Sequence, residues 1–186
     1  YTTLFRSAQK LMAWKVPTMA RIANGWSMNT DTMGVYGNYY LKRAIVANAG
    51  LGANVPEDAV YPLNLADSAG RPLEGAHRYT IHFDRASMPP VNAFWSVTIY
   101  NAGDKMLIEN PINRYSIGNR TRGLVYNADG SLDIALQHAE PADPALRANW
   151  LPAPSCFTTS FSACMISVPR VSTTLPMKVF SSFASS

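Results

Sequence analysis

Cysteine, net charge and long apolar runs are all scarce in this chain of 186 residues, and each scarcity narrows the class of protein. Both cysteines, Cys156 and Cys164, fall in the last 32 residues, so cysteine usage says nothing about the redox compartment. No stretch approaches the roughly eighteen consecutive apolar residues of a membrane span, and no signal peptide is visible. We therefore expect one globular domain, or part of one, without a transmembrane segment.

The formal charge of +4 comes from the two ends of the chain. Arg6 lies near the start, and Arg170 and Lys178 are the charged residues of the last 32 positions, whereas residues 8–154 carry 13 basic and 12 acidic side chains. A strongly basic protein attracts nucleic acid or anionic membranes. Because the middle of this chain is nearly balanced, we expect no nucleic-acid partner.

Two helical stretches precede a region of short strands. Residues 8–24 show helical apolar spacing that Pro17 interrupts, which predicts two short helical pieces that form a linker. Residues 36–50 place Tyr36, Tyr40, Ala44 and Ala47 on one stripe of a predicted helix that ends at Gly50.

Beyond residue 50 the pattern changes to alternation with frequent turn residues. The stretch HRYTIHFDR, residues 77–85, puts Tyr79, Ile81 and Phe83 on one face of a predicted strand. FWSVTIY, residues 94–100, predicts a strand covered on both sides, and residues 123–138 predict a hairpin with its turn at Asp129-Gly130. Short strands and early helices indicate a mainly β fold, an antiparallel sandwich or barrel with short N-terminal helices.

Several ordered motifs in this region resemble one family. GLGAN, AVYP, LEG, PPVNAFWSVTIY, NRYSIGNR, NADGSLDIALQ and NWLPAP are similar to the family called domain of unknown function 1214, over residues 25–154. The resemblance implies a jelly-roll-like antiparallel β-sandwich in bacterial, often exported proteins, and hence a periplasmic or cell-envelope location. It also implies a companion domain, DUF1254, on the N-terminal side. It implies no established reaction.

Both ends of the chain depart from this pattern. The opening YTTLFRS matches the translation of a common sequencing adapter, so we expect residues 1–7 to be foreign to the natural protein. In the family, NWLPAP is followed by a last strand with an Arg-Leu-Tyr core, and a shifted reading frame through SACMI can encode it. Residues 155–186 hold nine Ser and no acid or Gly, which favours a frameshift over a genuine Ser-rich tail. Without the in-frame strand, we expect an unpaired sheet edge.

His82 and Asp84 are the candidates for acid–base chemistry, since they lie two apart on one strand face and a carboxylate can orient an imidazole. In the competing interpretation, Thr80, His82 and Asp84 form the ordinary solvent-facing row of a half-exposed strand. The spacing of His and Cys predicts no metal site. The chain lacks a Gly-x-Ser-x-Gly elbow and a phosphate loop, so no cofactor is expected.

Residues 109–120, ENPINRYSIGNR, supply the ligand-binding candidates. Arg114 offers a planar fork of donors for a carboxylate, phosphate or hydroxyl-rich ligand, and Asn113, Tyr115 and Trp95 are expected to shape the site. In the competing interpretation Arg114 braces loops by donating to backbone carbonyls while Tyr115 and Trp95 fill the core.

Two classes of function stay open. The domain either binds a small molecule or glycan, or has a structural role, in the cell envelope; or it is part of a hydrolase-like enzyme whose site forms with the missing N-terminal domain. The absence of a nucleophile–base pair in the sequence favours the first class.

Overall fold

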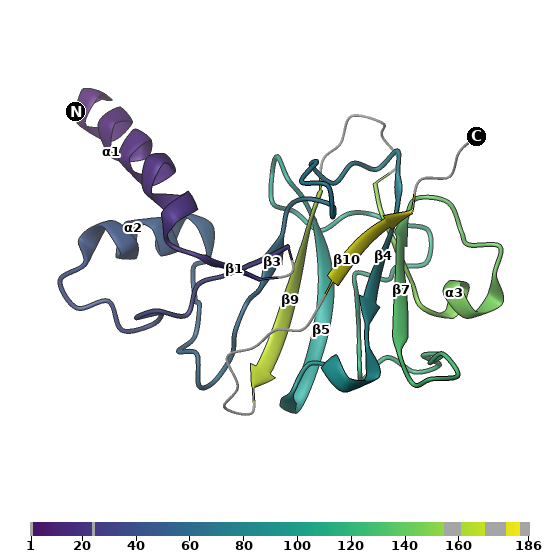
Figure 1. Ribbon diagram of the computed structural model, residues 1–186. Helices are drawn as coiled ribbons and strands as arrows, with labels where there is room; N and C mark the ends of the chain where they lie inside the picture. Colours follow the sequence, from purple (N-terminus) through teal and green to yellow (C-terminus); the bar gives the residue numbers. More distant parts are fainter. Residues whose placement is uncertain (1, 24, 155–160, 170–177, 183–186) are drawn as a thin grey trace.

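Two β-sheets carry the fold in the computed structural model, which describes residues 2–23, 25–154, 161–169 and 178–182, the last two stretches as backbone (Figure 1). One sheet has six strands in the order β1 (Arg21–Ala23), β2 (Trp26–Met28), β3 (Leu63–Asn64), β9 (Phe161–Pro169), β5 (Val91–Asn101) and β6 (Ser116–Gly118). The other has four, β10 (Lys178–Ser182), β4 (Arg78–Phe83), β7 (Leu132–Gln137) and β8 (Trp150–Pro152). Only the β7–β8 pair among these is parallel.

The two sheets share one hydrophobic core. The buried side chains of β4 and β7 meet those of β5 and β6, as the alternation of apolar residues in these segments requires. Phe83 of β4 and Trp95 of β5 mark the contact, because their ring centroids are 5.0 Å apart. The predicted inward face of residues 77–85 is confirmed: Tyr79, Ile81 and Phe83 are all buried.

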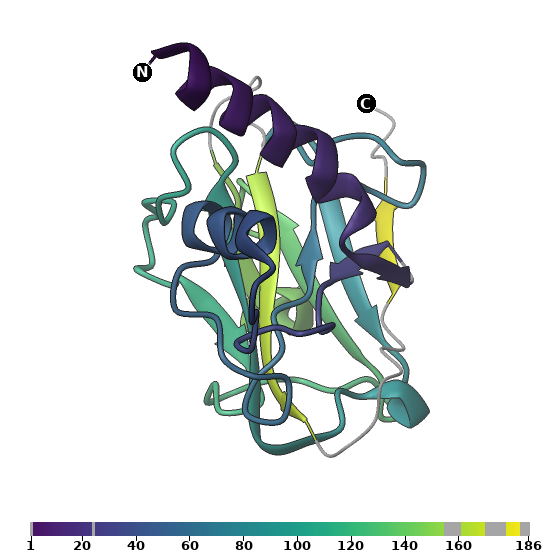
Figure 2. The ribbon, with the colours of Figure 1, turned by 90° about the vertical axis from the view of Figure 1, so that its left-hand side faces the viewer.

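The helices lie to one side of the sheets. α1 (Thr2–Lys15) and α2 (Tyr40–Ala49) are on the same side as β1, and Figure 2 shows both in front of the sheets from that side. A short third helix, α3 (Pro144–Ala148), begins at Asp143, whose carboxylate accepts a hydrogen bond from the amide of Ala145 at 2.9 Å. The fold is therefore mixed, with helices and sheets together. The jelly-roll arrangement within it stays a prediction.

The N-terminal helices differ in detail from the prediction. α1 is one helix that passes into the 3-10 turn η1 (Val16–Thr18) at Pro17, and β1 follows where a second helical piece was expected. α2 starts at Tyr40 and closes before Gly50. Its buried residues are Lys42, Ile45 and Val46, whereas Tyr40 of the predicted stripe is 68% exposed. The buried positions therefore lie on nearly the opposite side of the helix from the predicted stripe. On the buried side Lys42 Nζ donates to Thr32 Oγ1 at 3.1 Å.

The predicted hairpin of residues 123–138 is half confirmed. Its turn forms, with Gly130 at φ 83° and a hydrogen bond from the Gly130 amide to the Asn127 carbonyl. Its second arm is β7, but residues 124–127 form no strand. The side chain of Asn149 accepts a hydrogen bond from the Val125 amide and donates one to the Val125 carbonyl. At Val125 the expected first strand therefore bonds to a side chain instead of to β7.

The last strands also differ from expectation. β9 lies between β3 and β5 and pairs with β5 from Trp95 to Asn101, after an irregularity that follows Val91. The prediction of an unpaired sheet edge is therefore wrong at β5, because the backbone of β9 pairs with it. Residues 155–160, 170–177 and 183–186 lie outside the described residues, and the frameshift itself stays a prediction.

Candidate functional site

The 109–115 loop follows β5 and leads into β6, and one asparagine organises it. The Asn110 Oδ1 atom accepts the amide of Arg114 at 2.9 Å, and its Nδ2 donates to the carbonyls of Ile108 at 3.1 Å and Arg114 at 3.0 Å. Asn113 has a left-handed backbone with φ 51°, which asparagine tolerates better than most residues. The loop is thus held in one conformation by its own side chains.

A shallow hollow of about 350 Å³ opens on this loop. We call it the Tyr115 hollow, and its lining residues are Glu109, Asn110, Pro111, Asn113 and Tyr115. Glu109, Pro111 and Asn113 are exposed, while Tyr115 is half-buried. Two of the four predicted ligand-binding residues, Asn113 and Tyr115, therefore come together at one hollow.

The other two predicted residues are used elsewhere. The Arg114 Nη1 atom donates to the carbonyls of Ala148 at 3.0 Å and Trp150 at 2.8 Å, which ties the loop to the segment between α3 and β8. Trp95 is 2% exposed, and its ring lies in the core against Phe83. These contacts favour the bracing interpretation of Arg114 and the core interpretation of Trp95, and a ligand contact by either stays a prediction.

The second predicted pair, His82 and Asp84, gains a partner that sequence reasoning missed. The His82 Nδ1 atom lies 2.6 Å from an Asp133 carboxylate oxygen, and its Nε2 lies 3.2 Å from Asp84 Oδ1. β4 and β7 are antiparallel neighbours in which His82 and Asp133 are directly paired. Asp133 lies between the buried residues Leu132 and Ile134, so alternation in the sequence could have predicted that it faces outward. The sequence does not show that it pairs with His82, because the register of two strands is set by the fold. We call these three residues the His82 row.

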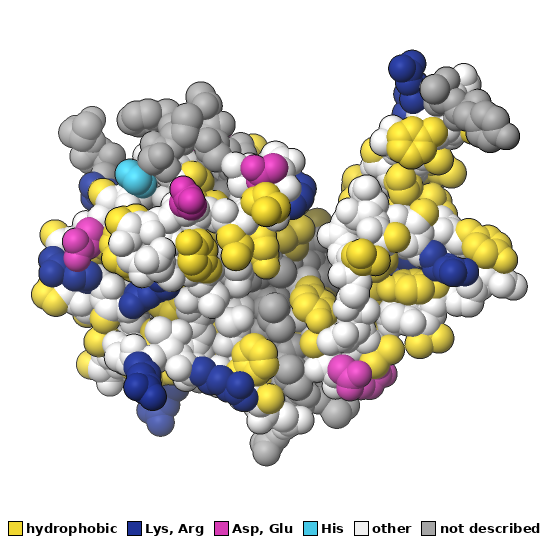
Figure 3. Space-filling model, turned by 180° about the vertical axis from the view of Figure 1, so that it is seen from behind, with side chains coloured by type: hydrophobic (Ala, Val, Ile, Leu, Met, Phe, Trp, Pro, Cys, Tyr) yellow, Lys and Arg dark blue, Asp and Glu magenta, His cyan; other side chains and the backbone are white. Residues whose placement is uncertain are grey.

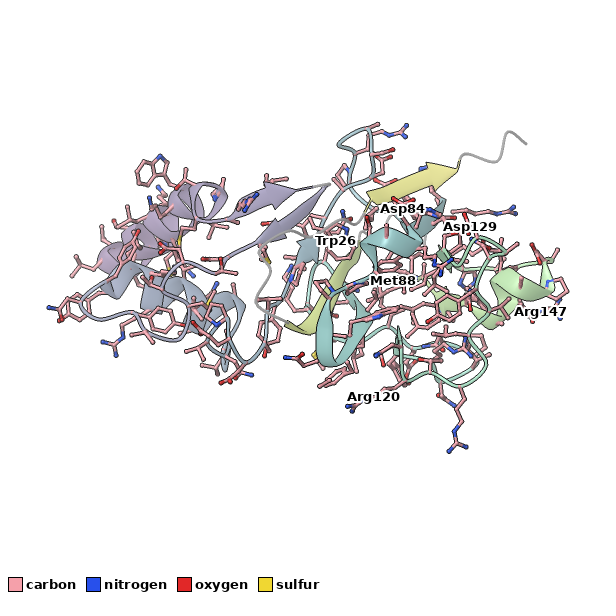
Figure 4. All side chains as sticks on the ribbon, turned by 60° about the horizontal axis from the view of Figure 1, so that its bottom comes forward. Trp26, Asp84, Met88, Arg120, Asp129 and Arg147 are labelled. Atoms are coloured by element: carbon pink, nitrogen blue, oxygen red, sulfur yellow. The ribbon has the colours of Figure 1, made fainter. Side chains whose placement is uncertain are left out.

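Hydrogen bonds extend the His82 row toward the 127–131 turn. Asn127 Nδ2 donates to Asp133 Oδ2 at 2.7 Å, and the Ser131 hydroxyl donates to Asp129 Oδ1 at 2.6 Å. In Figure 4 Asp84 and Asp129 lie near one another, with Arg147 farther out on the α3 side. Among the described residues, no cluster of His, Cys, Asp and Glu has an arrangement that could hold a metal ion.

The carboxylates around His82 set its protonation. The hydrogen bond to Asp133 raises the pKa of His82 above its ordinary value, burial opposes that shift, and the charges of Asp133 and Asp84 add to it. At the neighbouring turn, hydrogen bonds from the Ser131 hydroxyl and amide lower the pKa of Asp129. The imidazolium form of His82 is therefore favoured, with each ring nitrogen facing a carboxylate.

The chain is a two-sheet domain with one shared core and helices on one side. Its polar clusters lie on the loops next to β5 and β7, which is where such domains carry binding sites. The chain belongs to the DUF1214 family, described as "Protein of unknown function (DUF1214)", whose sequence profile matches residues 58–165. The match includes both the His82 row and the Tyr115 hollow, and it ends inside β9.

Solved structures similar to this chain include one from Vibrio parahaemolyticus and one from Burkholderia cenocepacia. The VPA0106 protein from Vibrio parahaemolyticus is 25% identical, with a TM-score of 0.67 over 96% of this chain and 43% of its own. An uncharacterised protein from Burkholderia cenocepacia is 15% identical, with a TM-score of 0.47 over 97% of this chain and 42% of its own. The chain thus spans less than half the length of either solved protein.

No curated protein matches the chain. Within the part of the chain that the structure describes, no helix has the length and apolar character needed to cross a membrane.

Proposed function

We propose that this domain binds a small molecule or glycan at the Tyr115 hollow. The observation that carries the proposal is the hollow itself, because its volume of about 350 Å³ is in the range of small-ligand clefts and it combines an aromatic ring with polar groups. Tyr115 offers a flat ring and a hydroxyl, and Asn113 offers an amide. The hydrogen bonds of Asn110 support the proposal further, because a loop already ordered loses little entropy when a ligand binds.

Replacing the aromatic platform tests this function. Tyr115→Ala should weaken ligand binding about tenfold or more, because it removes most of the contact area that the hollow offers. The measurement is a titration of the isotope-labelled protein by NMR with a panel of sugars, carboxylates and phosphates. Tyr126→Ala, at a 46% exposed position on another loop, is the matched control. If no compound of the panel shifts the resonances of residues 109–115, the structural role is favoured instead.

For the fold as a whole we infer a jelly-roll-like sandwich in a protein of the bacterial cell envelope. The chain crosses between the two sheets after β3, β4, β6, β8 and β9, as it does in folds of that kind, and the shared core supports face-to-face packing. The location rests on the family resemblance. Fractionation of the native cells tests it, with recovery from the cytoplasm as the contradicting result.

We further propose that a companion domain of the DUF1254 type covers the helical side. Leu11, Trp14 and Ile22 are 48%, 69% and 71% exposed there, and Figure 3 shows hydrophobic side chains gathered on this projecting part. An amphipathic helix of α1's length is marginal without packing. The VPA0106 chain has room for such a domain, because the match covers 43% of it.

Substitutions on that face test the companion domain. The double change Leu11→Ser and Trp14→Ser should lower the melting temperature of a longer form that includes the domain, and should change that of the present chain little. Met106→Ser, at a 65% exposed position, is the control. Equally small changes in melting temperature in the longer form and in the present chain would contradict a covering domain.

A hydrolase-like enzyme is the second candidate, and the His82 row favours it. Asp133 holds the Nδ1 of His82, as a carboxylate holds the base in acid–base sites. If this site works in the longer form, His82→Gln should reduce turnover by about 10²-fold or more in a screen of nitrophenyl esters and glycosides. Equal turnover of the variant and the unchanged protein would end this alternative.

A further inference from the structure

The charges around the Tyr115 hollow indicate which ligands it accepts. Among the five residues that line it, Glu109 alone is of the Asp, Glu, Lys or Arg type, and its side chain is exposed. The nearest cation in the sequence is Arg114, which is absent from the lining because its Nη1 donates to two backbone carbonyls. The lining of the hollow therefore includes one carboxylate and no cationic side chain.

The remaining polar groups of the hollow suit hydroxyls. Asn113 can donate and accept through its amide, Tyr115 through its phenol, and the Glu109 carboxylate can accept two or more hydroxyl hydrogens. Asn110 adds no free amide, because both of its polar atoms bond within the loop. The Tyr115 ring and Pro111 supply flat apolar surfaces that match the C–H face of a sugar ring.

We propose that the ligand of the Tyr115 hollow is a hydroxyl-rich ring compound without negative charge, such as a sugar, and that Glu109 excludes anionic ones. This inference rests on the proposed binding function, and it narrows the ligand class from the wider set that includes carboxylates and phosphates. An anion in the hollow meets the Glu109 carboxylate, and none of the lining residues is a cation, so repulsion opposes its binding.

Three ligands that share one ring and differ in charge test the inference. Methyl glucoside, glucuronate and glucosamine are neutral, negative and positive, and NMR titration of the whole chain gives a Kd for each. Methyl glucoside should bind at least about tenfold more tightly than glucuronate. Glu109→Gln keeps the shape and removes the charge, so it should bring glucuronate to within about threefold of methyl glucoside. Glu57→Gln, on another exposed loop, is the control and should leave the ratio unchanged.

The outcomes separate the two levels of the proposal. If glucuronate binds as tightly as methyl glucoside and glucosamine, a ligand site exists but the exclusion of anions is wrong. If Glu109→Gln leaves the ratio unchanged, Glu109 does not set the selectivity. If none of the three compounds shifts the resonances of residues 109–115 while another compound of the panel does, the sugar class is wrong and the binding function stands. If nothing binds, both fail.

Discussion

At the scale of single residues, the bonding partners of a polar side chain decide its role. Arg114 was expected to present its donors to a ligand, yet two of its hydrogen bonds go to the carbonyls of Ala148 and Trp150. His82 was expected to lie beside one carboxylate, and it lies between two. Each arrangement makes a different measurement informative.

Arg114→Lys should lower the stability of the domain. Lysine keeps the charge but loses the planar fork, so at least one of the two backbone carbonyls is left without its donor, which costs on the order of 1–3 kcal/mol. Arg122→Lys, at an exposed position, should change stability by less than about 0.5 kcal/mol. Chemical denaturation of the three proteins measures the difference. Unchanged stability together with weaker ligand binding would instead return Arg114 to the ligand site.

The His82 row should make stability depend on pH. Because its folded-state pKa is raised, His82 contributes its full stabilisation below the unfolded pKa of about 6.5 and loses it as pH rises through the folded value. The loss should stay within about 1 kcal/mol, since the row is partly exposed.

Melting temperatures measured from pH 5.5 to 9 test this dependence. The gap between the unchanged protein and His82→Gln should narrow as pH rises. A gap that widens with pH would have the wrong sign for an imidazolium held by carboxylates.

At the scale of elements, single side chains join segments that are distant in the sequence. Asn149, which is 2% exposed, accepts the Val125 amide and donates to the carbonyls of Val125 and Asp133. This one amide group therefore links the 124–127 segment to β7 at the start of β8. Gly118 joins elements in another way, because its lack of a side chain lets the backbones of β6 and β5 come close together.

Asn149→Ala should destabilise the domain by about 1–3 kcal/mol, because it removes the partner of three part-buried backbone groups, the amide and carbonyl of Val125 and the carbonyl of Asp133. Hydrogen exchange of the Val125 amide should rise more than that of the Ile81 amide in β4. If both amides keep their protection, the 124–127 segment is held by other contacts.

Gly118→Ala should also destabilise, by more than about 2 kcal/mol, since a Cβ there would lie 2.1 Å from the Trp95 carbonyl oxygen and the β5–β6 backbones would have to separate. At Gly50 an added Cβ meets no atom closer than 4.0 Å, so Gly50→Ala serves as the control. Thermal melts compare the two, and equal melting temperatures would show that β6 can shift without cost.

At the scale of the whole molecule, the last described strands complete both sheets. β9 separates β3 from β5, and β10 lies at the edge beside β4. Removing residues 155–186 should therefore expose the edges of β3, β5 and β4, and we expect the shortened protein to aggregate or to lose its cooperative melt. A soluble, cooperative shortened protein would contradict this role. Restoring the suspected reading frame in the full chain should raise its melting temperature.

The sequence by itself determined the elements with strong local signals. Alternation predicted the inward face of β4, Asp129-Gly130 predicted the turn before β7, and ordered motifs predicted the family. These features depend on periodicity and on backbone preferences within a few residues, which a sequence displays directly.

Only the tertiary structure decided the partners. Asp133 is 51 positions from His82, and Trp150 is 36 from Arg114, so neither contact follows from local spacing. The packed face of α2, the use of Asn149 in place of a strand, and the separation of Arg114 from Asn113 and Tyr115 have the same cause. Long-range packing selects which polar groups meet, and free energies of a few kcal/mol at each contact override local preference.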